Sequence, residues 1–167
     1  MPSDPNTYRG IGGWLLVFVI GAGILSPLLF IFTAMTSYYP LFADGTWQVL
    51  TTPTSPIYHP LWKPTMLLEM VGSFAVVAFG VYAAIQLFAE KPGGPAAAIA
   101  FLLANLLLTV VDQTLVSAIP RAAVQASSID LIRAALAAVI WIPYFKLSKR
   151  VKATYSLSED RPEVSAS

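Results

Sequence analysis

The sequence predicts an all-α, polytopic membrane protein whose four transmembrane helices form an antiparallel bundle. Of its 167 residues, 56% are hydrophobic and only 11% are charged, whereas soluble domains carry about 25% charged residues. The mean hydropathy is +0.68. Four apolar stretches are long enough to cross a bilayer core of roughly 30 Å as helices. We expect these spans at residues 12–35, 66–89, 96–119 and 128–145, within a single domain that covers residues 1–155.

The first span begins at residue 12, within the stretch from Arg9 to Trp14, which is a charged and aromatic pattern typical of a membrane boundary. It is longer than the roughly 7 to 15 apolar residues of a signal peptide, so we expect the mature protein to retain it. Pro27 removes a helical hydrogen bond and predicts a kink. Residues Thr36 to Thr65 are rich in proline and in aromatic residues with a polar tip, so this loop is predicted to lie on the membrane surface.

Spans two and three are joined by the turn sequence from Glu90 to Pro95, which predicts antiparallel neighbours. In span three, Asn105, Thr109 and Asp112 recur at positions i, i+4 and i+7 and therefore form a polar stripe on one helix face. We expect this stripe to face the inside of the bundle, because polar groups are costly against lipid.

The fourth span is predicted to begin at a capping box, in which Ser127 is the cap and Asp130 its partner. We expect the helix to run on toward Tyr155. Its far end carries a basic anchor made of Lys146, Lys149, Arg150 and Lys152. The polar residues 156–167 that follow are predicted to be a disordered cytoplasmic tail.

The distribution of lysine and arginine predicts the orientation. Arg9, Lys91 and the basic anchor fall on one side of the predicted membrane, against Lys63 and Arg121 on the other. By the positive-inside rule both termini are therefore expected in the cytoplasm. The aromatic residues predicted to lie at the membrane interfaces are Trp14, Trp47, Trp62, Trp141 and Tyr144.

Three charged residues inside the spans, Glu69, Asp112 and Arg133, are predicted at a similar depth in the outer third of the membrane. An unpaired charge at the bilayer centre costs about 2.5 to 3.5 kcal/mol on insertion scales, so we expect the three side chains to touch. Such a cluster is either a salt bridge that fixes helix register or a proton or cation site. Two further possibilities are that Arg133 extends to the outer interface and that Glu69 is solvated.

Several classes of site are disfavoured by composition. The chain has no cysteine, which excludes disulfides, thiolate catalysis and iron–sulfur clusters. His59 is the only histidine and has no second histidine to complete a metal or haem site, and no span carries a histidine that could act as a base for serine or threonine. We therefore expect no metal, no cofactor, no nucleic acid partner and no complete catalytic set.

Two segments carry a resemblance to a known family. They are Gly10-Ile-Gly-Gly-Trp-Leu, and Ile140-Trp-Ile-Pro-Tyr-Phe followed by Ser148, Arg150-Val-Lys and Thr154-Tyr. With these segments, with Glu69 near the start of span two and with Arg133 in span four, the chain resembles domain-of-unknown-function family 2569. The resemblance covers nearly the whole chain. It implies a small four-span protein of the bacterial inner membrane, and it implies no activity.

From these features we expect an accessory, stabilising or assembly subunit of a larger membrane complex, which acts through helix–helix contacts with a membrane protein partner or with its own copies. Small residues on the span faces favour such contacts. The alternative is a small oligomeric transporter or proton-linked permease that uses Glu69, Asp112 and Arg133. A third hypothesis is a membrane-embedded lipid-modifying enzyme with His59 or a carboxylate as its base.

Overall fold

A computed structural model describes residues 10–120 and 128–155, and this described part is helical with no strand. Three stretches are long and apolar enough to cross a membrane, namely Trp14–Ala43, Trp62–Phe88 and Gly94–Ser117. Helices α8 (Ile129–Leu147) and α9 (Lys149–Tyr155) meet the same criteria only as a pair, bent by 58°. The described chain therefore has three candidate spans, or four if the bent pair is one span. The elements are α1 (Trp14–Ile20), η2 (Gly21–Leu25), α2 (Ser26–Thr33), η3 (Ala34–Tyr38), α3 (Tyr39–Ala43), α4 (Thr46–Thr51), α5 (Trp62–Phe88), α6 (Gly94–Ser117), α8 (Ile129–Leu147) and α9 (Lys149–Tyr155).

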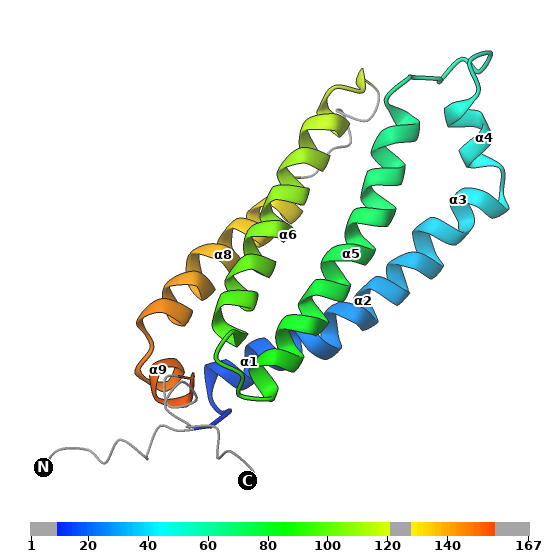
Figure 1. The fold of residues 1–167 in the computed structure, drawn as a ribbon. Helices are drawn as coiled ribbons and strands as arrows, with labels where there is room; N and C mark the ends of the chain where they lie inside the picture. The colour runs from blue at the N-terminus through cyan, green and yellow to red at the C-terminus, as the bar shows by residue number, and fades with distance from the viewer. Residues whose placement is uncertain (1–9, 121–127, 156–167) are drawn as a thin grey trace, which may run out of the picture.

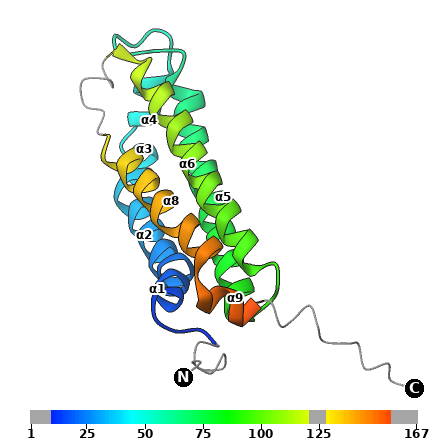
Figure 2. The same cartoon turned by 90° about the vertical axis from the view of Figure 1, so that its left-hand side faces the viewer.

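The long helices pack side by side into an elongated bundle (Figures 1 and 2). Helix α6 contacts both α5 and α8, while α1, η2 and α2 pack against α5. Helix α9 turns across one end of the bundle, and α3 and α4 lie at the opposite end (Figure 1). We call these the α9 end and the α4 end.

The first helix is longer than the sequence predicted. It runs to Ala43 instead of ending at residue 35, and α4 follows, so much of the predicted surface loop is helical. Pro40 does not stop this helix, because a π-helical turn precedes it. Pro64 stands in the first turn of α5, which begins at Trp62, where a missing backbone N–H costs little.

Both prolines of the first helix follow a π-helical turn, in which the hydrogen bonds run over five residues instead of four. The turn η2 ends two residues before Pro27, and η3 ends two residues before Pro40. A proline ring clashes with the carbonyl four residues earlier, and a π turn at that place moves the carbonyl out of register. Pro27 was expected to remove a helical hydrogen bond and kink the helix. The structure accommodates it by a local change of hydrogen-bond register within one long helical stretch.

The buried apolar core lies at the α9 end. Its members come from α1, η2, α5, α6, α8 and α9, and several are alanines that let the helices approach closely. At one such close approach, a Cβ added to Gly23 would lie 3.0 Å from the Cβ of Ala84. The core residues are Leu15, Phe18, Ala22, Ala84, Leu87, Ala98, Leu102, Phe145, Val151 and Tyr155.

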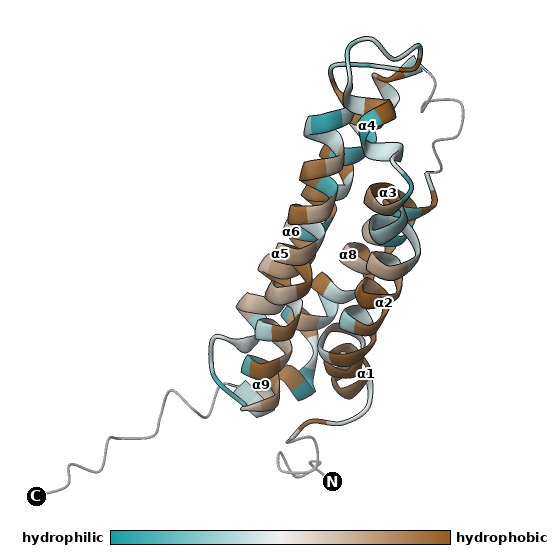
Figure 3. Ribbon diagram, turned by 90° about the vertical axis from the view of Figure 1, so that its right-hand side faces the viewer, coloured by the Kyte–Doolittle hydropathy of each residue, from teal (hydrophilic) through white to brown (hydrophobic). Residues whose placement is uncertain are grey.

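Large apolar side chains also cover the outside of the bundle. Phe32, Phe88 and Val139 are among the most exposed, and hydrophobic residues dominate the middle of the helices while hydrophilic residues gather near α4 and α9 (Figure 3). A continuous apolar exterior of this kind is expected of helices that face lipid. The described helices thus have the character of an integral membrane protein.

The turn between α5 and α6 supplies a test of this packing. A Cβ on the buried Gly94 would lie 3.1 Å from the carbonyl oxygen of Gln86 and 3.2 Å from the Cα of Leu87, both backbone atoms that cannot rotate away. We expect Gly94→Ala to destabilise the protein by about 1 to 3 kcal/mol, as overpacking does. Thermal unfolding in detergent would measure this. Gly93→Ala is the matched control, because a Cβ there meets nothing within 4 Å; equal unfolding midpoints for the two variants would contradict the predicted clash.

Candidate functional site

At the α9 end, the segment before α1 is tied to α9 by polar contacts. The backbone N–H of Gly10 donates a hydrogen bond to Oγ1 of Thr154 at 3.1 Å. Nη1 of Arg150 donates to the carbonyl oxygen of Gly10 at 3.5 Å. Gly12 lies directly against the same guanidinium, since a Cβ there would be 3.1 Å from Nη1 of Arg150. Two segments about 140 residues apart in the chain are therefore joined at this end.

A second buried contact joins α9 to α5. The hydroxyl of Tyr155 donates a hydrogen bond of 2.8 Å to the carbonyl oxygen of Leu87, in the last turn of α5. Val151 and Thr154 on the same short helix are also buried. Helix α9 is thus a packed part of the bundle.

Aromatic rings fill the space above α9. The ring of Phe18 lies 5.0 Å from Trp141, 4.9 Å from Phe145 and 6.2 Å from Phe101, each measured between ring centroids in an edge-on arrangement. Edge-on pairs at this distance are favourable beyond the area they bury. We call Phe18, Phe101, Trp141 and Phe145 the aromatic plug, and these rings belong to or pack against the buried core at the α9 end.

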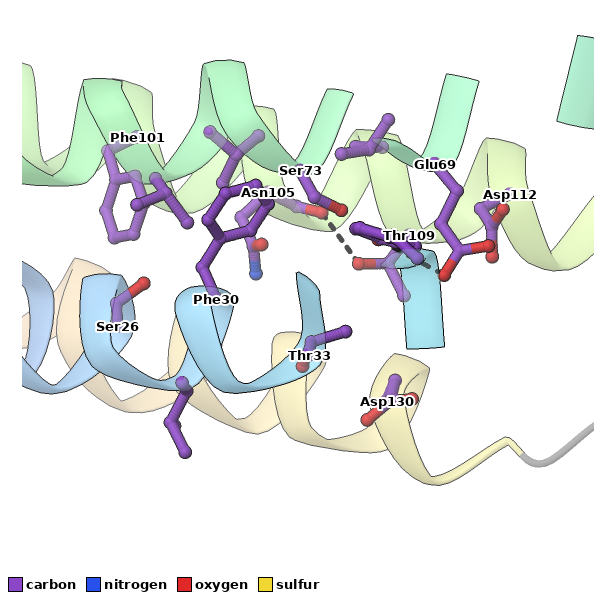
Figure 4. Close-up of a pocket in the computed structure, with 15 residues that line it drawn as sticks. Ser26, Phe30, Thr33, Glu69, Ser73, Phe101, Asn105, Thr109, Asp112 and Asp130 are labelled. Carbon is purple, nitrogen blue, oxygen red and sulfur yellow. Dashed lines mark hydrogen bonds between the residues drawn. The ribbon is translucent and has the colours of Figure 1, made fainter. Parts of the chain in front are cut away.

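Toward the α4 end, the same helices surround a cavity of about 400 Å³ (Figure 4). We call it the acidic cavity. Its walls come from α2, η3, α5, α6 and α8, and they mix apolar side chains with hydroxyl, amide and carboxyl groups. The lining residues are Ser26, Leu29, Phe30, Thr33, Tyr38, Glu69, Ser73, Val76, Val77, Phe101, Asn105, Leu108, Thr109, Asp112 and Asp130.

Three carboxylates from three helices line this cavity. Glu69 lies on α5, Asp112 on α6 and Asp130 on α8. Figure 4 shows Glu69 and Asp112 next to each other at one end of the cavity, with Phe101 toward the other end. Among the lining residues that the structure describes there is no lysine, arginine or histidine.

Arg133 does not join Glu69 and Asp112, which corrects the predicted three-way cluster. Its Nη1 donates to Oδ1 of Asp130 at 3.0 Å, and the two side chains are 74% and 77% exposed. The two residues are three positions apart on α8, near its first turn, so each is the other's nearest opposite charge and Arg133 extends toward the surface. Ser127 of the predicted capping box lies outside the described residues, and Ser128, the observed N-cap, makes no side-chain cap hydrogen bond.

The two remaining carboxylates have few partners. Tyr38 donates a long hydrogen bond of 3.4 Å from its hydroxyl to Oε1 of Glu69. Oδ1 of Asp112 is buried and accepts no hydrogen bond within the described chain. An unsatisfied buried oxygen is rare in folded proteins and calls for an explanation, such as a bound group.

The predicted polar stripe of α6 lines the acidic cavity. Asn105, Thr109 and Asp112 all face it, although the Thr109 hydroxyl donates to the carbonyl oxygen of Asn105 within its own helix at 2.8 Å. The same i, i+4, i+7 spacing recurs in two other sets of residues that line the cavity. One comprises Ser26, Phe30 and Thr33, and the other comprises Glu69, Ser73 and Val76.

Tyr38 was missed for a different reason. The sequence placed it in a surface loop, whereas the structure places it in η3, where it reaches the cavity.

The other predicted residues lie away from this cavity. Lys146, Lys149 and Lys152 are exposed around the α9 end, and Arg150 is half-buried. Trp14, Trp141 and Tyr144 line an apolar groove at that end. Trp47 in α4 packs on Phe42 with 5.2 Å between ring centroids, and Trp62 begins α5.

His59 makes a local contact in the segment before α5. Its Nδ1 accepts a hydrogen bond of 3.3 Å from the backbone N–H of Leu61. It lines a small cavity with Trp62 and Ile119. Over residues 10–120 and 128–155, no three histidine or acidic side chains form a group that could hold a metal ion.

A family model described as a protein of unknown function, DUF2569, matches residues 8–156. The chain belongs to this family. No curated protein and no solved structure matches it. In this DUF2569 chain the two segments that carried the resemblance meet at the α9 end, where Gly10 contacts Thr154 and Trp14 lies 6.2 Å from Trp141. The two segments that carried the resemblance therefore pack together at the α9 end.

The contact of Tyr155 with α5 gives a prediction for this end. Tyr155→Phe removes one buried hydrogen bond and keeps the ring, so we expect a loss of about 1 kcal/mol in unfolding free energy. The comparison is Tyr39→Phe, because Tyr39 is exposed on α3. Thermal unfolding of both variants in the same detergent is the measurement. A Tyr155→Phe midpoint no lower than that of Tyr39→Phe would show that α9 adds nothing through this bond.

Proposed function

We propose that this DUF2569 protein is a small transporter whose acidic cavity admits a small polar solute into the membrane. One observation carries the proposal: a cavity of about 400 Å³ that is lined by carboxyl, hydroxyl and apolar groups lies among otherwise apolar helices, with a buried, unpartnered carboxylate oxygen on Asp112. Ionisable residues inside membrane spans are costly and usually mark the path of an ion or substrate.

The contrast between the two halves of the bundle supports this proposal over a purely structural role. The α9 half is held together by alanines, aromatic rings and satisfied hydrogen bonds. The α4 half instead places Glu69 and Asp112 at a cavity with one long hydrogen bond to Tyr38. Replacing buried polar groups by apolar ones is often stabilising, so a protein that needed only stability would not require this arrangement.

We further infer a bacterial inner-membrane protein, an antiparallel bundle, and cytoplasmic termini at the α9 end. Among the described basic residues, Lys146 lies in the last turn of α8, Lys149 and Lys152 lie in α9 and Lys91 lies in the α5–α6 turn, whereas Lys63 lies in the first turn of α5. Helix α9 and the α5–α6 turn are at one end of the bundle and the start of α5 is at the other (Figure 1), in agreement with the positive-inside rule. Arg9 and Arg121, which also entered the prediction, lie outside the described residues. In this orientation the acidic cavity belongs to the outer half of the membrane, with the aromatic plug between it and the cytoplasm.

The accessory-subunit hypothesis and the lipid-modifying enzyme hypothesis stay predictions. The first is tested by purifying the tagged protein from its own host in mild detergent and identifying stoichiometric partners by mass spectrometry. The second is tested by measuring lipid modification by His59→Ala and Glu69→Gln variants, and normal activity in both would exclude it.

Transport is tested by osmotic swelling of proteoliposomes that contain the full chain. The solutes are glycerol, urea, choline chloride and potassium chloride, each compared with protein-free vesicles. We expect at least one solute to enter faster with the protein, and we expect Asp112→Asn to abolish this increase, because it removes a negative charge that lines the cavity. Asp44→Asn is the matched control, an exposed residue between α3 and α4. Swelling that is unchanged in Asp112→Asn, or no entry of any solute, would overturn the proposal.

A further inference from the structure

We infer that the solute of the acidic cavity is a small organic ammonium cation, which bears a positively charged nitrogen on a compact carbon skeleton. This inference rests on the proposed function and names the class of substrate that the cavity selects.

The first argument is charge. The described lining contains three carboxylates and no cationic side chain. Asp130 is paired with Arg133, which leaves Glu69 and Asp112 without a cationic partner among the described residues. In a medium of low dielectric constant, two such carboxylates repel an anion strongly and favour a cation.

The second argument is the kind of surface beside the carboxylates. The cavity is also lined by the rings of Phe30, Tyr38 and Phe101, and the first two lie 6.4 Å apart between centroids. Faces of aromatic rings attract cations, and quaternary ammonium groups are a common ligand of such surroundings. A cavity lined by both rings and carboxylates suits a cation that has a partly apolar surface.

The third argument is size and polarity along the cavity. A volume of about 400 Å³ falls within the roughly 300 to 1,000 Å³ of small-molecule sites and is far larger than a bare inorganic ion needs. Glu69 and Asp112 lie at one end and Phe101 toward the other (Figure 4). The charged nitrogen is therefore expected near the two carboxylates, with the carbon skeleton directed toward the aromatic plug.

Choline is the probe, and 3,3-dimethyl-1-butanol is the matched control, because it has the same shape with a neutral carbon in place of the charged nitrogen. Binding of each to the purified full-length protein is measured by isothermal titration calorimetry, with sodium and potassium chloride as competitors. We expect choline to bind, the neutral isostere to bind at least about tenfold more weakly, and neither salt to compete at equal concentration. Truncating one partner of a buried charge pair has an effect of at least this size.

Three variants separate the contributions. Glu69→Gln and Asp112→Asn should each weaken choline binding by about tenfold or more, because each removes one negative charge. Phe30→Leu should weaken it by about two- to fivefold, because it keeps an apolar side chain and removes the ring. Asp44→Asn should leave binding unchanged. Size-exclusion profiles identical to the unmodified protein establish that each variant is folded.

The possible failures are distinguishable. Equal binding of the isostere, or competition by sodium or potassium at the same concentration, overturns the organic-cation inference. If at the same time glycerol or urea enters the proteoliposomes in an Asp112-dependent way, the proposed transport function stands. If choline does not bind and no solute enters, both the inference and the proposed function fail.

Discussion

The contact between the segment before α1 and helix α9 is the constraint on which the rest of the bundle depends. A hydrogen bond joins Gly10 to Thr154, and a second hydrogen bond joins the Tyr155 hydroxyl to the last turn of α5. The ring of Phe18 also packs against Phe101, Trp141 and Phe145. Together these contacts bring the first helix, α5, α6 and the α8–α9 pair into one core. Because lipid chains are as apolar as the helix surfaces, close packing and internal hydrogen bonds must supply this association.

Fixing the helices at the α9 end leaves the α4 end free to enclose polar groups. The core residues cluster toward α9, and in the other half the same helices present hydroxyl and carboxyl groups to the acidic cavity. The two π-helical turns lie in the helix that forms one wall of this cavity, and η3 brings Tyr38 to Glu69. Such turns are frequent at functional sites because they displace one side chain without ending the helix. Stability and the candidate site are thus placed in different halves of one bundle.

The site was partly predictable from particular residues. The i, i+4, i+7 spacing of Asn105, Thr109 and Asp112 gives an inward stripe on any α-helix, and these residues do line the cavity. The partner of Arg133 was not predictable from its depth in the span, because a carboxylate three residues away on the same helix competes with carboxylates on other helices. Tyr38 was assigned to a loop because the nearby Pro40 is typical of loops. Only the structure shows the π turn that accommodates this proline within a helix.

The sequence by itself determined the class of protein. Composition and local spacing are enough to give the apolar stretches of bilayer length, the family, and the polar positions on each helix face. Only the tertiary structure decided which of these faces meet. It directed Glu69 and Asp112 into one cavity and Arg133 outward, and it brought the two family segments together at the α9 end. The physical reason is that helix periodicity is a local property, whereas the pairing of faces depends on close contacts such as that of Gly23 with Ala84, between residues far apart in the chain.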